Sequence, residues 1–191
     1  MVSCPRELVK EIILISALRS QAPSPETTRS AYDILARVEA FSPQEWTTTT
    51  RESFHDDWLI LARLYHAATA LYCILSLQSS GAFRDPHQMS PSPKLELARA
   101  RHARHLFALL ERAVATPRVR RRMSWALIVA GVEASRASDE VQRYIGEKLA
   151  DMSRDQGIAS PLVARAVLER FWARGGGRWD DCFDDAFAFI M

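Results

Sequence analysis

The chain has 191 residues, of which 48% are hydrophobic and 25% are charged, and its formal net charge is +2. This composition is that of one globular domain with a core of reasonable size, and it excludes a disordered or low-complexity chain. The three cysteines, at positions 4, 73 and 182, match no metal-binding spacing and leave one unpaired, which excludes a disulfide framework and a self-contained zinc module. We expect reduced thiols in an intracellular protein.

The apolar segments do not predict targeting or membrane insertion. The first run, Ile12–Ile15, follows acidic residues and lacks the small-residue cleavage site of a secretory signal. The longest, Trp58–Leu77, is close to the roughly 20 residues that a membrane-spanning helix needs, but Arg63 and His66 interrupt it. We therefore predict a buried helix in a soluble protein without membrane contact.

Helix-start signals dominate the chain, and strand signals are nearly absent. Four Ser-Pro pairs offer an N-cap hydroxyl followed by a proline suited to the first helical position; they begin at Ser24, Ser42, Ser92 and Ser160. Ser42 also precedes Glu45 by three residues, as in a capping box. The β-branched run Thr47–Thr50 has no apolar face and is predicted to lie between helices.

These signals predict an all-α fold, a single bundle of seven or eight helices with no sheet, as one domain over residues 1–191. The helices are expected near residues 5–20, 25–40, 52–80, 93–116, 121–136, 139–156, 161–174 and 180–190. The third is apolar on several faces, so we expect it to run through the middle of the bundle. The Pro-rich segment near residues 81–92 predicts an exposed loop.

Positive charge is concentrated in residues 94–122, which carry nine basic and two acidic groups. Four arginines there form a candidate basic patch for nucleic acid: Arg118, Arg120, Arg121 and Arg122. Three upstream arginines could extend the patch into a stripe: Arg99, Arg101 and Arg104. Because no aromatic residues alternate with these arginines, single-strand binding is disfavoured, and a solvated arginine-rich surface is the preferred interpretation.

Near the C-terminus, Asp180, Asp181, Asp184 and Asp185 form a D-D-x-x-D-D pattern. On a helix these carboxylates share a face and could hold Mg²⁺ against a diphosphate, as in all-helical prenyl-transferring enzymes. No second metal-binding motif follows, and apolar residues alternate with the acids at helical spacing. We prefer the polar side of an amphipathic last helix, and a Mg²⁺-dependent prenyl-diphosphate enzyme is the less favoured alternative.

Other candidate residues have simpler interpretations. His102 and His105 lie among arginines that would repel a metal ion, and they are expected to be exposed or half-buried. Cys73 lies in a buried apolar run without a basic partner. We predict no catalytic residue, metal site or cofactor in this chain, and we do not expect an enzyme.

Three stretches in order resemble a known family. They are Cys4-Pro5-Arg6-Glu7-Leu8 leading into Glu11–Leu18, then Trp125–Ala134, then Leu168-Glu169-Arg170-Phe171-Trp172 followed by Trp179. In this order and spacing they resemble the C-terminal regulatory domain of fungal zinc-cluster transcription factors, the fungal-specific transcription factor domain. The resemblance covers nearly the whole chain, although that family typically has Trp-Pro where this chain has Trp125-Ala126.

The resemblance implies an all-α, nuclear, non-enzymatic domain that regulates transcription through protein partners, either a second copy of itself or the transcription machinery. In such proteins a six-cysteine zinc cluster contacts DNA, and this chain has no such cluster, so DNA contact is expected only indirectly. Some relatives bind small hydrophobic effectors such as sterols in this domain. A standalone helical adaptor is the alternative without a DNA-binding half.

Five apolar residues are spaced to face inward from two helices: Trp125, Ile128, Val132, Phe171 and Trp172. Burying such side chains contributes about 1.5–3 kcal/mol each, so they are expected to be core. The sharper hypothesis is that some of them line an effector pocket between the helices. Gly131, in the middle of its helix, costs roughly 1 kcal/mol relative to Ala, which suggests a close approach of a second helix there.

Overall fold

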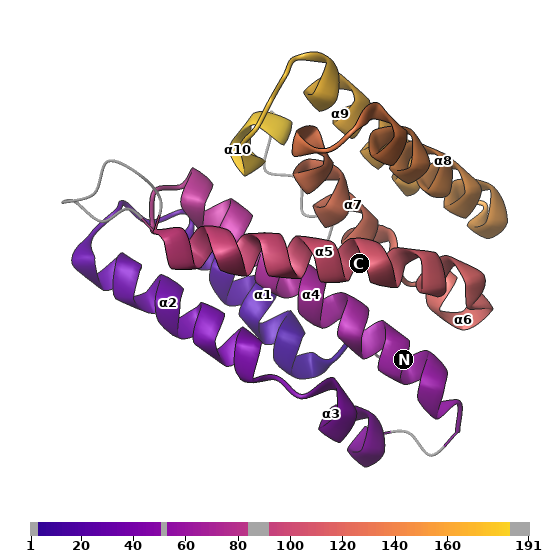
Figure 1. The fold of residues 1–191 in the computed structure, drawn as a ribbon, viewed down its shortest axis with the longest axis horizontal. Helices are drawn as coiled ribbons and strands as arrows, with labels where there is room; N and C mark the ends of the chain where they lie inside the picture. Colours follow the sequence, from indigo (N-terminus) through magenta and orange to yellow (C-terminus); the bar gives the residue numbers. More distant parts are fainter. Residues whose placement is uncertain (1–3, 51–52, 84–91, 184–191) are drawn as a thin grey trace.

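The computed structural model describes residues 4–50, 53–83 and 92–183, and this part of the chain is helical with no strand (Figure 1). The all-α prediction is therefore confirmed. Eight of the ten described α-helices have seven or more residues. They are α1 (Arg6–Leu18), α2 (Pro25–Ala40), α3 (Pro43–Thr50), α4 (His55–Ser79), α5 (Pro93–Ala115), α6 (Pro117–Arg120), α7 (Ser124–Glu133), α8 (Asp139–Gln156), α9 (Ser160–Ala173) and α10 (Trp179–Cys182), with a 3-10 turn at Ala134–Arg136.

Helix α4 runs through the middle of the bundle, as its sequence predicted. It packs against α1, α2, α3, α5 and α7, and Figure 1 shows α1–α3 on one side of it and α8–α10 on the other. It is long and apolar enough to span a membrane, but 78% of its most apolar 18-residue window is buried inside the protein. Packing against these helices, and also against α6 and α10, accounts for this apolar sequence.

The predicted helix starts agree with the structure to different degrees. Ser24 caps α2: its hydroxyl accepts from the Thr27 N–H at 3.1 Å, and the Thr27 hydroxyl accepts from the Ser24 N–H at 2.7 Å. Ser92 precedes α5, but its side chain makes no capping bond within the described residues. The cap of α9 is Ala159, one residue before the predicted Ser160.

The prediction that the run Thr47–Thr50 lies between helices is wrong, because these residues form the second half of helix α3. The Ser42 hydroxyl accepts from the Glu45 N–H at 3.2 Å and so begins the helix. Three hydroxyls then donate to carbonyls four residues earlier, from Thr47 at 2.6 Å, Thr48 at 2.8 Å and Thr49 at 2.8 Å. This back-bonding satisfies the hydroxyls inside a helix, and it overrides the β preference of threonine.

The structure also corrects two predicted boundaries, one of a helix and one of a loop. The helix expected at 121–136 begins at Ser124, after the short α6 and a turn. Of the loop expected to be exposed near 81–92, Ala82 and Phe83 are buried, and the Phe83 ring packs edge-on against Tyr32 with centroids 5.0 Å apart. Residues 84–91 and 184–191 lie outside the described residues, so the predicted helix at 180–190 is described only as far as Phe183.

Candidate functional site

The five apolar residues singled out in the sequence lie on α7 and α9, where three of them belong to the core and Trp125 and Trp172 pack against it. Ile128, Val132 and Phe171 are buried. The half-buried Trp125 ring stacks on Tyr65 with centroids 5.6 Å apart and an interplanar angle of 17°. All these contacts are core packing. An effector pocket at these residues stays a prediction.

Gly131 explains how closely α7 and α9 approach. A Cβ atom at this position would lie 2.4 Å from Cδ1 of the buried Leu168, so only glycine fits without movement. The Trp172 indole donates from Nε1 to the Gly131 carbonyl at 2.9 Å, across the same contact. The close approach predicted from the sequence is confirmed.

The arginines of the candidate basic patch point toward different elements. The Arg118 guanidinium lies 3.5 Å from the Phe54 ring centroid and pairs with Asp57 of α4 at 3.4 Å. Arg120 pairs instead with Asp155 of α8 at 3.1 Å. Arg122 donates to the Arg118 carbonyl at 2.9 Å, and its guanidinium lies 5.6 Å from the Trp58 ring centroid. The aromatic partners are Phe54, which directly precedes α4, and Trp58 in its first turn, about 60 residues earlier in the chain, so no local pattern could reveal them.

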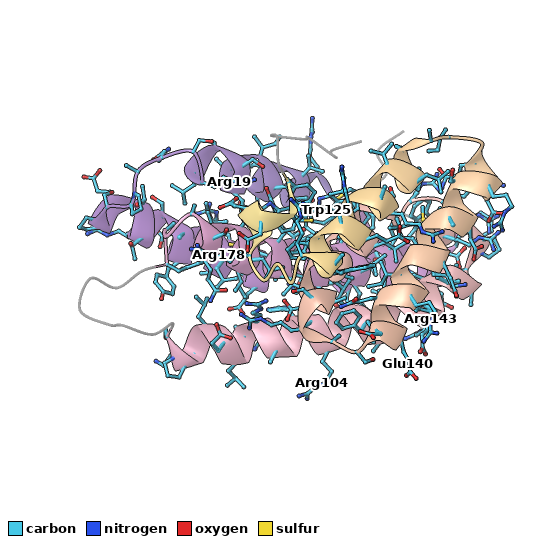
Figure 2. All side chains as sticks on the ribbon, turned by 90° about the horizontal axis from the view of Figure 1, so that it is seen from above. Arg19, Arg104, Trp125, Glu140, Arg143 and Arg178 are labelled. Atoms are coloured by element: carbon cyan, nitrogen blue, oxygen red, sulfur yellow. The ribbon has the colours of Figure 1, made fainter. Side chains whose placement is uncertain are left out.

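The upstream arginines do not extend the patch into a continuous stripe, which corrects that expectation. The Arg99 side chain is only 5% exposed, and it donates from Nε and Nη2 to one oxygen of Glu133 at 2.9 and 2.6 Å. Arg101 pairs with Glu39 of α2. Arg104 points away from the body of the molecule in Figure 2. Burial of Arg99 therefore interrupts the stripe.

The described aspartates of the C-terminal motif are engaged in structural contacts. Asp180 accepts from Arg19, which directly follows α1, and, at 2.7 Å, from the Ser79 hydroxyl of α4. Asp181 accepts from the N–H groups of Gly177 at 3.3 Å and Arg178 at 3.0 Å. Asp184 and Asp185 lie outside the described residues. Within the part of the chain that the structure describes, no group of three His, Cys, Asp or Glu side chains is placed to hold a metal ion.

A histidine pair lies between α4 and α5. His102 was expected to be exposed or half-buried but is buried, with Nε2 3.3 Å from Oε1 of Glu39. The His66 ring lies 6.1 Å from it, and His66 Nε2 is buried without a hydrogen-bond partner among the described residues. Burial is the main reason that the pKa of each histidine lies below its usual value. Sequence reasoning missed Glu39 and His66, because α2 and α4 supply them.

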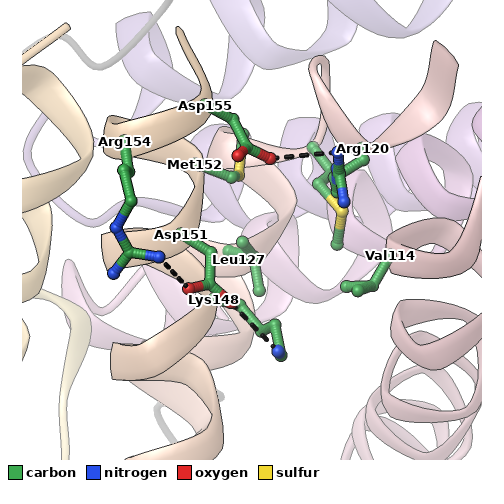
Figure 3. A pocket seen from close by; sticks show the side chains of 9 residues that line it. Val114, Arg120, Leu127, Lys148, Asp151, Met152, Arg154 and Asp155 are labelled. Atoms are coloured by element: carbon green, nitrogen blue, oxygen red, sulfur yellow. Dashed lines mark hydrogen bonds and ion pairs between the residues drawn. The ribbon is translucent and has the colours of Figure 1, made fainter. Parts of the chain in front are cut away.

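A pocket of about 150 Å³ lies between α6 and α8 (Figure 3). Its floor is apolar: Met123, Leu127 and Met152 are all buried. Its rim carries the charged side chains. The lining residues are Val114, Arg120, Met123, Leu127, Lys148, Asp151, Met152, Arg154 and Asp155.

The rim of this pocket is held by ion pairs. Asp151 accepts from Lys148 and from Arg154, each at 3.1 Å, and the hydrogen bond from Lys148 is the main reason that the pKa of Asp151 is lowered. Asp155 pairs with Arg120 from the opposite side of the pocket. Arg120 Nε is buried and has no hydrogen-bond partner in the described part of the chain. Three cations face two carboxylates, so the rim carries one net positive charge.

The sequence singled out Arg120 but missed its neighbours on α8. Their positions 148, 151, 152 and 155 share one helical face, and this spacing was the signal available. The spacing does not indicate which element packs against this face of α8. Only the fold places this face of α8 opposite α6.

The described residues thus form an all-α domain, and no group of three His, Cys, Asp or Glu side chains among them could hold a metal ion. The family model described as the fungal specific transcription factor domain matches residues 1–188, and the chain belongs to this family. The resemblance seen in the sequence is confirmed. Family membership points to a regulator of transcription rather than an enzyme.

A curated relative is the phomenoic acid biosynthesis cluster-specific transcriptional regulator of Leptosphaeria maculans. It is 37% identical over 196 residues, which cover 98% of this chain and 36% of that protein. The chain therefore spans about a third of the length of this relative. No solved structure matches the chain.

Proposed function

We propose that the chain is a nuclear regulatory domain that changes transcription through contacts with proteins, while DNA is bound by a zinc cluster outside residues 1–191. The observation that carries this proposal is the family match over residues 1–188. The relative's name, a cluster-specific transcriptional regulator, adds support. By analogy with that name, the regulated genes form a biosynthetic cluster.

The arrangement of arginines supports indirect contact with DNA. A duplex-binding face needs several cations free to neutralise phosphates along one stripe. Here Arg118 and Arg120 pair with carboxylates of two different helices, and Arg99 is buried against Glu133. Direct binding would show a steep salt dependence, and we expect no duplex binding at low salt.

Exposed apolar side chains on α9 support a role in protein contacts. Leu162 and Val163 of α9 are each about half exposed, at 47% and 49%. Exposed apolar side chains that adjoin one another are more common at protein contacts than elsewhere on a surface. The proposed partner is the transcription machinery or a second copy of the chain.

The enzyme alternative is less well supported, because Asp180 and Asp181 already accept hydrogen bonds from the protein. Mg²⁺-dependent turnover of a prenyl diphosphate that Asp181→Asn abolishes would favour it. A standalone adaptor would not change transcription when it is brought to a promoter, and this result distinguishes it from the proposed regulatory domain.

The test is to fuse residues 1–191 to an unrelated DNA-binding domain and to measure a reporter of intermediate basal output. We expect output to rise or fall relative to the DNA-binding domain alone. An unchanged output from a fusion shown to be folded and nuclear would contradict the proposal. The purified chain, mixed with duplex DNA at low salt, tests separately whether it binds DNA itself.

A further inference from the structure

We propose that the outer face of α9 binds a second copy of the chain, with the two α9 helices antiparallel across a two-fold axis. This pairing would supply a protein partner of the proposed regulatory domain, and in that sense it rests on the proposed function. Three features of the face support it: its exposure, the order of its large and small side chains, and its charges.

The outer face of α9 forms an open groove. Helix α9 packs against α7, α8 and α10, and the groove lies on the side that the described part of these helices leaves uncovered. The residues that line the groove are all exposed: Val163, Ala166, Glu169, Arg170 and Ala173. Leu162, about half exposed beside Val163, extends its apolar part. A partner therefore meets solvent-accessible atoms without any change in the fold.

Large and small side chains follow one another along this face in an order that fits a second α9. Ala159, Ala166 and Ala173 are spaced by seven residues, the repeat that keeps one face of a helix turned toward a partner helix. The larger Leu162 and Val163 follow the first of these alanines. When Val163 of one copy lies opposite Ala173 of the other, a large side chain fits against a small one, and the two-fold axis repeats this contact.

The charges of the groove are self-complementary in this alignment. The Arg170 guanidinium makes no ion pair within the described residues, and Glu169 uses Oε1 for Arg165 of its own helix at 2.7 Å. In the antiparallel pair, Glu169 of each copy lies about one helical turn from Arg170 of the other, within reach of these long side chains. A parallel pair would place like charges opposite each other. The charges therefore select the antiparallel orientation.

The expected dimer is weak and reversible. One helix of 14 residues from each copy forms the contact, so the buried area is expected to lie below the roughly 1,200 Å² of a standard stable interface. We expect a Kd on the order of 10 μM. Because the same face is used by both copies, association should stop at two chains.

Sedimentation equilibrium of the purified 191-residue chain measures this association, and two charge variants test its geometry. Arg170→Glu and Glu169→Arg each place like charges opposite each other in the dimer, so each should weaken self-association by about tenfold or more. An equimolar mixture of the two variants should associate again, because each copy then meets the opposite charge. A mixture that stays monomeric would overturn the proposed pairing of Glu169 with Arg170.

The matched control is Arg143→Glu, which makes the same change of charge at an exposed arginine of α8 that does not line the groove. It should dimerise as the wild type does. Equal weakening by Arg143→Glu would show a general effect of net charge and would overturn the assignment to α9.

A further variant tests the apolar part of the groove. Val163→Glu puts a charge where the dimer needs an apolar contact, and it should weaken self-association about tenfold while circular dichroism shows a folded chain. Unchanged dimerisation of folded Val163→Glu would place the contact elsewhere and overturn the proposal. So would a wild type that stays monomeric up to about 1 mM, which would leave this face to a different protein.

The proposed function and this dimer fail in different measurements. A chain that dimerises but does not change the output of the tethered reporter contradicts the proposed function. A chain that changes reporter output but sediments as a monomer contradicts the dimer.

Discussion

The Arg99 guanidinium donates two hydrogen bonds to a single oxygen of Glu133, and both side chains are almost fully buried. This ion pair joins the second turn of α5 to the last residue of α7. It ties the long helix pair α4–α5 to the part of the bundle formed by α7, α8 and α9. Removing one partner leaves a buried charge without compensation.

Arg99→Leu should therefore lower the free energy of unfolding by about 3–5 kcal/mol, as for other buried pairs that lose one partner. The double variant Arg99→Leu/Glu133→Leu should recover most of that loss, because it leaves no unpaired charge. Urea unfolding followed by circular dichroism measures both. A double variant as unstable as the single one would show that packing, not charge, dominates this contact.

Gly131→Val should destabilise the domain by about 1–3 kcal/mol, because the new side chain meets Leu168 where α7 and α9 touch. Adding Leu168→Ala should relieve the clash, so the double variant should lose less stability than the sum of the losses in the two single variants. Thermal unfolding of the two single variants and of the double variant is the measurement. Gly157→Val is unsuited as a control, because Gly157 has a φ of +67°. Gly146, in the middle of α8 and with no atom closer than 3.7 Å to its Cβ position, is the matched site.

Acid should destabilise the domain before its carboxylates titrate. The unfolded chain protonates its histidines near pH 6.5, whereas burial lowers the pKa of His66 and His102 in the fold. The unfolded state therefore binds more protons below pH 6.5, and the free energy of unfolding falls as the pH falls. Urea unfolding between pH 7.5 and 5 measures this slope. His66→Gln should make it shallower, and an identical slope would exclude His66 as a source.

Trp125→Ala separates core packing from effector binding. The indole contacts Tyr65 and Tyr72 of α4, and it does not line the pocket between α6 and α8. Because Trp125 is only half-buried, the loss of stability should be near or below the low end of the roughly 3–5 kcal/mol typical of aromatic-to-alanine changes. Reporter output that loses an effector response while stability is unchanged would instead favour an effector site at Trp125.

Much of the fold followed from local signals. The Ser24-Pro25 pair predicted the start of α2, and the apolar length of residues 52–80 predicted the central helix. Gly131 predicted a close helix contact, because glycine in the middle of a helix has a local cost that packing must offset. Each of these features depends only on residues within a few helical turns of one another.

The features that the sequence did not reveal depend on distant residues. Glu133 is 34 positions from Arg99, and only the packing of α5 on α7 turns a surface arginine into a buried one. The pocket needs α6 and α8 side by side, which no spacing within either helix predicts. Helix α3 was missed for a local reason, because the β preference of four threonines was given more weight than the cap at Ser42.

The central claim, that this domain regulates transcription, is tested most directly by reporter output from the tethered chain. The wild type, Arg99→Leu and Arg99→Leu/Glu133→Leu should be compared at equal protein level. We predict that the wild type changes output, that Arg99→Leu loses the change, and that the double variant restores it with its fold. Output equal to that of the DNA-binding domain alone, from all three fusions with the wild type folded, would contradict the claim.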